Sequence, residues 1–375
     1  MIKADYDINI GHHLLKDSGD WARKCLSERT NKIALISNRK VFRLYGETVE
    51  TSLKSAGFKT CVWLMNDGEK YKNFRSLEKA LKFFGENQLT RTDAALALGG
   101  GVVGDLAGFA SAIYLRGIDF LQFPTTLLAM IDSSVGGKTA VNTEFGKNLV
   151  GAFYPPKGVL VDVETLKTLH QREITAGLCE AVKQGAVGSR KLFDQTAAFL
   201  EKYPNNKFKS CFSDEKFLSD LKNLIYSQIS FKAEIVYQDE KENTARIDAK
   251  SRKILNYGHT LAHALEKVTD YKYFKHGEAV GYGILFAADI AKRLDILEDN
   301  ELKLLNDVLH RVGNLPQIPK INSEQIIEAI KFDKKSAGGS LQWILLEKIG
   351  KPVILSDREI PPSIIKKSLD KILKN

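Results

Sequence analysis

The chain has 375 residues, of which 43% are hydrophobic and 27% charged, as in an ordinary soluble globular protein large enough for two domains. No apolar run approaches the roughly 20 residues of a membrane-spanning helix, and the first residues lack a signal-peptide layout. Four scattered cysteines without a CxxC pair argue against a disulfide framework or zinc finger and favour a cytoplasmic location. The net charge of +9 comes from lysines mixed with glutamates rather than from a basic stripe, so we expect no nucleic-acid partner.

The first part of the chain alternates between strand and helix patterns. Ile33 to Ser37 is a buried-strand run, and Val41 to Ser55 has helical periodicity. Thr60 to Leu64 predicts a second strand, and Phe74 to Glu86 a second helix. This alternation predicts an α/β domain with a parallel sheet and helices on both faces, where ligands bind outside the carboxyl ends of the strands.

A glycine-rich stretch follows the next predicted strand. The strand Ala94 to Leu98 runs into Gly99-Gly100-Gly101, and a small-residue helix is expected over Leu106 to Ile113. Glycines between a strand and a helix let the backbone approach a ligand and leave N–H groups for a phosphate. The spacing is neither the dinucleotide fingerprint nor a Walker A loop, so a plain tight turn explains this stretch alone about equally well.

Two further glycine turns carry polar side chains. The strand Phe120 to Phe123 ends in Pro124-Thr125-Thr126, and turns are expected at Gly136-Gly137-Lys138 and Gly146-Lys147-Asn148. Lysines and an asparagine beside such turns indicate a site for an anionic, hydroxylated substrate next to a nucleotide. We therefore expect an enzyme.

The second half of the chain is predicted to be mostly helical. Gly158 to Asp162 is the last convincing strand, which places a domain boundary near residue 160 and gives domains of 1–160 and 161–375. Phe208 to Asp214 and Asn314 to Lys320 are expected as loops. Leu341 to Leu346 and Pro352 to Leu355 are expected to form a short hairpin.

Three residues of the helical half are candidate metal ligands, namely Glu180, His259 and His276. Taken singly, each histidine is more typical of a hydrogen-bonded structural residue. His259 and His263 have the histidine spacing of an HExxH site, but Thr260 stands where that motif needs its glutamate. Spacing alone leaves open which pair would bind a metal.

Several motifs together are more specific than any one residue. They are GGGVVGDLAGF from Gly99, YLRG from Tyr114, FPTTLLAMIDSSVGGKTAVN from Phe123, GKNLVGAFYPP from Gly146, the N-x-G-H-T-x-x-H-A-x-E pattern from Asn256, and HGEAV from His276. With these motifs the chain closely resembles the 3-dehydroquinate synthase family of sugar-phosphate cyclases. The resemblance implies a Rossmann-like NAD-binding domain followed by a mostly α-helical metal- and substrate-binding domain. It also implies a phosphorus–oxygen lyase of the shikimate pathway that uses NAD and Zn²⁺ or Co²⁺, in which NAD⁺ transiently oxidises a ring alcohol before phosphate leaves.

The same resemblance implies roles for particular residues. The metal ligands would be Glu180, His259 and His276, with His263 handling a proton. The substrate-binding residues would be Asp132, Lys138, Asn148, Lys183, Lys232, Arg252, Asn256, Lys335 and Arg116, of which Lys138, Lys183, Arg252 and Asn256 are also expected to be catalytic. The NAD-binding residues would be Asn38, Asp67, Gly68, Glu69, Lys70, Lys72, Gly100, Gly101, Val102, Val103, Gly104, Asp105, Thr125, Thr126, Lys138, Lys147, Thr165, Leu166, Lys167 and Thr168. Arg116 reaches a neighbouring subunit in that family, which implies a homodimer.

The chain departs from the family pattern at one point. In the family the pattern D-E-x-E-x-G-x-R-x-x-L-N follows the residue that corresponds to Lys232, with three residues between its second Glu and the Arg, and it carries an acidic catalytic residue at this point. Here nine residues, 243–251, separate Glu242 from Arg252. Glu242 matches when the pattern is counted from the left, and Asp248 matches when it is counted back from Arg252. We favour Glu242, because the Asp-Glu-Lys-Glu run is intact and extra residues can loop out at small entropic cost.

Three alternatives remain at the level of sequence. Other sugar-phosphate cyclases, a metal-dependent alcohol or glycerol dehydrogenase, and a non-catalytic NAD-binding regulator could each carry parts of this pattern.

Overall fold

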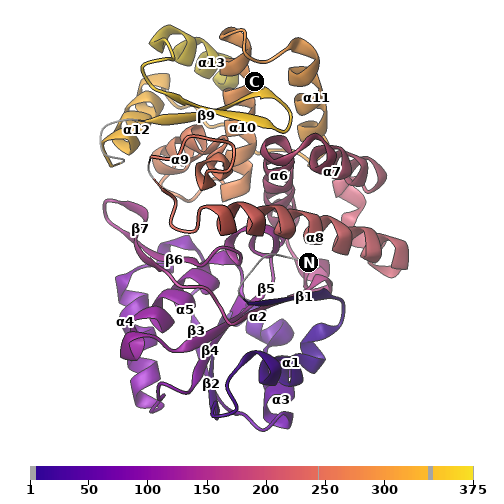
Figure 1. Cartoon of the computed structure of the whole chain (residues 1–375), viewed down its shortest axis with the longest axis vertical. Coiled ribbons are helices and arrows are strands. Elements are labelled where there is room, and N and C mark those ends of the chain that lie inside the picture. Colours follow the sequence, from indigo (N-terminus) through magenta and orange to yellow (C-terminus); the bar gives the residue numbers. More distant parts are fainter. Residues whose placement is uncertain (1–5, 244, 337–340, 375) are drawn as a thin grey trace. The chain divides into compact units, whose positions relative to one another are not determined.

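The computed structural model describes residues 6–243, 245–336 and 341–374, with the side chains of 332–336 left out (Figure 1). The chain forms two compact units: Met1–Leu169 with Asp214–Ala233, and His170–Ser213 with Glu234–Asn375. The sequence placed a single division near residue 160, whereas here the chain leaves the first unit after Leu169 and returns to it for one segment. The functions expected for the two domains stay predictions.

The first unit is built on a six-stranded sheet of parallel pairs, in the order β1-β8-β5-β4-β2-β3. The strands are β1 (Asp7–Gly11), β2 (Lys32–Asn38), β3 (Lys59–Met65), β4 (Ala94–Gly99), β5 (Asp119–Pro124) and β8 (Gly158–Asp162). The α/β class and the five strands predicted from apolar runs are confirmed. The polar edge strand β1 was not predicted. The strand order reverses between β2 and β4, and such switch points hold the ligand crevice in open α/β sheets.

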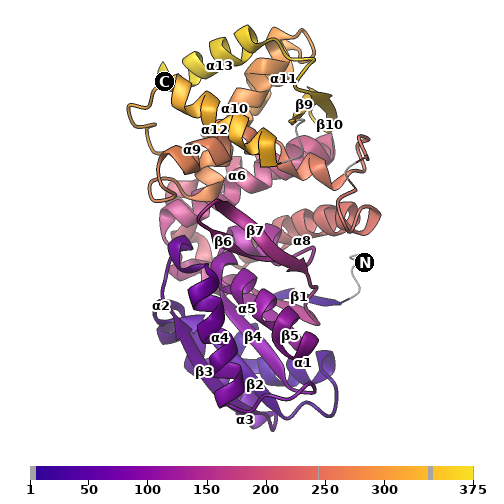
Figure 2. The same cartoon turned by 90° about the vertical axis from the view of Figure 1, so that its left-hand side faces the viewer.

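Helices cover both faces of this sheet because its strands are apolar on both sides. On β2, Ala34 and Ile36 face a core shared with α4 (Phe74–Glu86) and α5 (Gly101–Ile113), the helices in front of the sheet in Figure 2. Alternate residues of the same strands face a second core. That core is shared with α1 (Ser18–Cys25) and with α3 (Glu47–Ser55), which α2 (Arg39–Val41) and a π-helical turn precede. Each fully buried Leu, Ile or Phe stabilises the fold by roughly 1.5–3 kcal/mol.

A hairpin of β6 (Lys138–Thr143) and β7 (Gly146–Phe153) packs on α5 and was not predicted. The prediction of a turn at Gly146-Lys147-Asn148 was wrong, because these residues begin β7, where Gly146 pairs with Thr143 of β6. Helix α5 also begins at Gly101 rather than at Leu106, so Gly99 ends the strand, Gly100 caps the helix and Gly101 is its first residue.

The second unit is mostly helical, and α8 (Glu215–Gln238) runs from the first unit into it. Its other helices are α6 (Gln171–Gly188), α7 (Arg190–Lys202), α9 (His259–Val268), α10 (His276–Arg293), α11 (Asp299–His310), α12 (Ser323–Ser336) and α13 (Pro362–Lys374). The expected hairpin is confirmed as β9 (Gln342–Lys348) and β10 (Lys351–Ser356). None of the helices in the described residues is long and apolar enough to cross a bilayer.

One loop prediction in this unit was wrong. The segment Phe208 to Asp214 lies largely in a 3₁₀ helix, Asn205–Ser213, because Phe208 and Phe212 are buried and anchor it. The other expected loop, Asn314 to Lys320, contains neither helix nor strand and is confirmed.

Candidate functional site

Close helix packing in the second unit brings three predicted metal ligands together. Glu180 lies on α6, and His259 and His276 are the first residues of α9 and α10. At Gly277 of α10, an added Cβ would lie 1.9 Å from the Ala176 carbonyl oxygen of α6. At Gly283 it would lie 1.8 Å from the Gly258 oxygen, next to His259. Only glycine permits both approaches, so these two positions set where the ligand-bearing helices meet.

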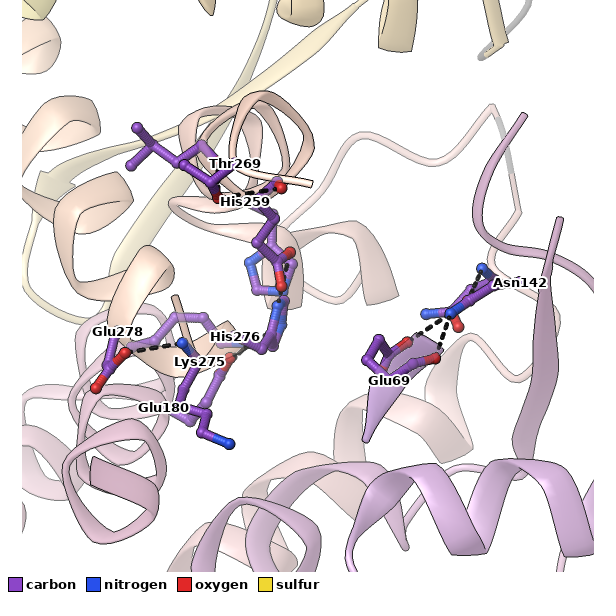
Figure 3. Close-up of polar contacts among 12 residues, drawn as sticks. Glu69, Asn142, Glu180, His259, Thr269, Lys275, His276 and Glu278 are labelled. Carbon is purple, nitrogen blue, oxygen red and sulfur yellow. Dashed lines mark hydrogen bonds and ion pairs between the residues drawn. The ribbon is translucent and has the colours of Figure 1, made fainter. Parts of the chain in front are cut away.

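The three side chains form a compact donor set (Figure 3). One ligand atom from each of Glu180, His259 and His276 lies within 4.8 Å of the others. His276 Nε2 is 3.5 Å from Glu180 Oε1, and the rings of His259 and His276 are 5.1 Å apart between centroids. Among the described residues, this is the one group of three or more such side chains close enough to hold an ion.

Neighbouring acceptors orient both histidines. His276 Nδ1 donates to Glu266 Oε2 at 3.3 Å, and His259 Nδ1 donates to the Tyr257 carbonyl at 3.3 Å. These contacts place the proton on Nδ1 and the lone pair on Nε2, the arrangement that metal-binding histidines usually have. Glu266 is the last residue of the motif from Asn256, but no role was predicted for it. Its presence in a motif with two histidines could have indicated an orienting carboxylate, since such groups commonly accompany histidine ligands.

The electrostatics of the cluster suit a divalent cation. Both carboxylate oxygens of the fully buried Glu180 accept no hydrogen bond among the described residues, while Lys183 Nζ lies 2.6 Å from Oε2 as an ion pair. Burial, together with the charges of Lys183, His276 and His263, holds the pKa of His259 well below its usual range. A neutral imidazole is the form that binds metal. One carboxylate and two imidazoles therefore fit Zn²⁺ or Co²⁺.

Further predicted residues of this unit lie around Asn256. Asn256 Nδ2 donates to Glu242 Oε1 at 3.4 Å. Asp248 instead accepts from Arg246 Nε at 2.9 Å, and its side chain is 61% exposed. Arg252 is buried, and its Nη1 donates to the Glu240 carbonyl at 2.8 Å. These contacts favour Glu242 over Asp248 as the acid that accompanies Asn256.

His263 is exposed on α9, with its ring centroid 5.3 Å from that of His259 and 6.1 Å from that of His276. Lys335 falls on α12, but its side chain lies outside the described residues.

In the first unit, the predicted NAD-binding residues follow the carboxyl ends of successive strands. Asn38 ends β2, and its Nδ2 donates to Asp67 Oδ1 in the turn after β3 at 3.2 Å. Gly100 caps α5 directly after β4, and the Thr125 amide, after β5, donates to the Gly99 carbonyl at 3.0 Å. The remaining members of this group are Gly68, Lys70, Gly101, Val102, Val103, Gly104 and Thr126 in the same turns, and Thr165, Leu166, Lys167 and Thr168 in the 3₁₀ turn after β8.

Buried Lys72 ties the strand ends to the β6–β7 hairpin. Its Nζ donates to Asp105 Oδ2 at 2.8 Å and to Asn148 Oδ1 at 2.7 Å, and lies 3.2 Å from Glu69 Oε1. Burial alone would lower the pKa of Lys72, but Asp105 and Glu69 outweigh it and raise that pKa, so the side chain stays charged. Asn142 of β6 also donates to Glu69 Oε1 at 2.8 Å, as Figure 3 shows. Because Asn148 adopts a left-handed backbone conformation (φ 56°), these contacts fix an otherwise uncommon geometry.

Other predicted substrate-binding residues of this unit differ in exposure. Buried Lys232 of α8 donates to the carbonyl and to Oδ1 of Asp132, at 2.6 and 2.7 Å. Lys138, at the start of β6, is exposed, and Lys147, on β7, is partly buried. Arg116 is exposed in a short turn after α5 and has a positive φ of 68°.

Comparison with known proteins gives the chain its family. The family profiles described as "3-dehydroquinate synthase N-terminal" and "3-dehydroquinate synthase C-terminal" match residues 62–176 and 177–336. The 3-dehydroquinate synthase of Picosynechococcus sp. is 41% identical over 354 residues, covering 94% of this chain and 92% of that protein.

Two solved structures share the fold over nearly the whole chain. A 2-deoxy-scyllo-inosose synthase, complexed with carbaglucose-6-phosphate, NAD⁺ and Co²⁺, has a TM-score of 0.81 at 26% identity, covering 99% of this chain and 98% of its own. A 2-epi-5-epi-valiolone synthase from Streptomyces hygroscopicus has a TM-score of 0.85 at 23% identity, covering 100% of this chain and 98% of its own, and supports the fold alone. The chain belongs to the 3-dehydroquinate synthase family.

Proposed function

We propose that this protein is a 3-dehydroquinate synthase, a lyase that converts 3-deoxy-D-arabino-heptulosonate 7-phosphate to 3-dehydroquinate and phosphate. The observation that carries the proposal is the Glu180, His259 and His276 donor set, placed in a chain that belongs to this family. The 41% identity to a named 3-dehydroquinate synthase favours this activity over that of the cyclases matched at 26% or less.

Two groups supply chemistry that side chains lack. When bound, NAD⁺ would accept and return a hydride, and a divalent ion would polarise the alcohol that is oxidised. Glu180, His259 and His276 would hold the ion, and the strand-end residues of the first unit would hold NAD.

Cationic side chains would bind the anionic groups of the substrate. Lys232 and Arg252 are buried and already fixed, by Asp132 and by the Glu240 carbonyl, so little side-chain entropy would be lost on binding. Exposed Lys138 would add a more mobile charge. A guanidinium and ammonium groups supply the charge-assisted hydrogen bonds that carboxylate and phosphate require.

Proton handling would fall to exposed His263 and to Glu242. His263 sits beside both imidazole ligands and is open to solvent, so it can exchange protons. The contact between Glu242 and Asn256 orients the carboxylate of the predicted catalytic acid.

The test is an assay of the purified protein with the heptulosonate phosphate, NAD⁺ and either Zn²⁺ or Co²⁺. Release of phosphate together with 3-dehydroquinate, without net NADH, is the expected result. Net NADH formed from glycerol or a simple alcohol would indicate a dehydrogenase. NAD binding without turnover of any of these substrates would indicate a regulator.

We also propose a homodimer in which exposed Arg116 completes the partner subunit's site. Arg116→Ala and His259→Ala proteins should each be inactive alone. Their mixture should regain activity, because a mixed dimer holds one site with both residues intact. A mixture as inactive as its components would contradict this arrangement.

A further inference from the structure

The chain segment between Glu242 and Arg252 is nine residues long, and its two ends, Asn243 and Ser251, meet at Asp239 in a narrow neck. Glu242 precedes the segment and Arg252 follows it, and both are assigned to the reaction above. Of its described outer residues, 245 and 247–250 are exposed, and partly buried Arg246 pairs with Asp248 at 2.9 Å. Extra chain between two functional residues costs little entropy to close but does not by itself hold them in place.

Asp239, at the carboxyl end of α8, lies at this neck and is 7% exposed. Its Oδ1 accepts from the Asn243 amide at 2.8 Å, and its Oδ2 accepts from the Arg252 amide at 2.8 Å. The hydroxyl of fully buried Ser251 also donates to Oδ2, at 3.3 Å. One carboxylate therefore joins the first residue of the segment to its last and to Arg252.

The charge state of Asp239 suits this role. Burial alone would raise the pKa of its carboxyl group, but hydrogen bonds from Asn243, Arg252 and Ser251 outweigh burial and lower that pKa. The group is thus ionised at neutral pH, where it accepts hydrogen bonds most strongly.

Both functional neighbours depend on the same anchor. The Glu242 amide donates to the Asp239 carbonyl at 3.1 Å, in a backbone conformation with φ 55°. The Arg252 amide is held by the Asp239 side chain. A shift of the carboxylate would therefore move the backbone of Arg252 directly, and that of Glu242 through the amide of the next residue, Asn243.

We propose that Asp239 is a positioning residue that closes the neck of the 243–251 segment and so keeps Arg252 and Glu242 in place. The inference rests on the proposed function, in which Arg252 binds an anionic group of the substrate. It also explains how this chain accommodates extra residues inside a catalytic motif.

The test compares Asp239→Asn with Asp248→Asn, which makes the same change in an exposed part of the same segment. An asparagine at 239 keeps one acceptor oxygen but presents an NH₂ group to a backbone donor. Losing one charge-assisted hydrogen bond should raise KM for the heptulosonate phosphate about tenfold or more. We expect kcat to fall less than KM rises, with Zn²⁺ affinity unchanged and only a small fall in Tm from the unsatisfied buried donor, and Asp248→Asn to match the unaltered protein. Asp239→Glu should restore part of the substrate affinity.

Hydrogen exchange of the unaltered protein and of both variants separates this proposal from the proposed function. In Asp239→Asn, the amides of Asn243 and Arg252 should exchange faster, whether or not the protein turns over the heptulosonate phosphate. Faster exchange in a protein that lacks the activity would support the positioning role of Asp239 and contradict the proposed function. Unchanged exchange, unchanged KM, or a loss of metal affinity as large as the loss of substrate affinity would overturn the positioning role.

Discussion

The two groups of predicted binding residues are built by different means. In the first unit, they follow the ends of parallel strands and bind one another, so that buried Lys72 is neutralised by Asp105 and Glu69. In the second unit, the Glu180, His259 and His276 set comes from three helices, and its single carboxylate pairs with Lys183, which lies one turn further along α6.

The two groups therefore obtain their geometry from different parts of the fold. Sheet topology places the predicted nucleotide-binding residues, since the turns after parallel strands meet at one edge of the sheet. Two glycine contacts on α10 and the acceptors behind the histidines place the predicted metal ligands. Ion pairs among its own members hold the first group, whereas helix packing and the groups behind the ligand atoms hold the second. Each prediction below tests one side of this contrast.

Replacing a metal ligand should have the largest effect. His259→Ala removes one of three donors, so bound metal should be lost and activity should fall about 1000-fold or more. The fold should persist, because the close contacts at Gly277 and Gly283, which bring the helices together, do not involve the His259 side chain. Metal content by mass spectrometry, phosphate release and circular dichroism check this, with His310→Ala, an exposed histidine of α11, as control. A His259→Ala protein that retains stoichiometric metal would contradict the ligand set.

On the nucleotide side, the expected loss is of stability. Lys72→Met leaves Asp105 and Glu69 without their buried counter-ion, which should lower the free energy of unfolding by about 3 kcal/mol and weaken NAD binding. Lys82 of α4, whose side chain is 73% exposed and which is not among the predicted NAD-binding residues, gives the matched control Lys82→Met. Denaturant unfolding and NAD titration measure both effects. Equal stability of the two variants would mean that Lys72 does not hold this group together.

The choice of catalytic acid gives a smaller effect on rate. Glu242→Gln should lower kcat about 100-fold, since it removes a titratable group that contacts Asn256. Asp248→Asn should leave kcat unchanged, because that side chain is exposed and paired with Arg246. Steady-state kinetics of both variants decide between them, and the reverse pattern would assign the role to Asp248.

The acceptor behind His276 should have the smallest effect. Glu266→Gln keeps an oxygen near Nδ1 but removes its charge, so Zn²⁺ affinity should fall about tenfold while Tm changes little. Competition with a chromophoric chelator measures the affinity, and Glu298→Gln, an exposed residue before α11, is the control. Equal affinities in the two variants would rule out an orienting role for Glu266.

In the first unit, the sequence predicted the buried strands of the parallel sheet better than it predicted the β6–β7 hairpin. Apolar runs such as Ile33 to Ser37 predicted buried parallel strands, because both faces of those strands are covered. The β6–β7 hairpin was missed, since its strands mix lysine, asparagine and glycine and one face is exposed. The same polar residues are the ones that contact Lys72 and Glu69.

In the helical unit, motif resemblance was more informative about the site than hydrophobic periodicity was. No periodicity links Glu180 to His259 and His276, so only the motif resemblance pointed to the three together. The role of Glu266 depends on how α9 meets α10, and that of Asp239 depends on where the extra segment folds back. Neither long-range contact leaves a local pattern in the sequence.

Anomalous diffraction at the zinc absorption edge, from crystals of the Zn²⁺-loaded protein, tests the central claim most directly. We predict a single peak per chain, at about 2.0–2.2 Å from one Glu180 oxygen and from one nitrogen each of His259 and His276. A peak on other residues, or a fully active protein with no peak at these three, would contradict the account.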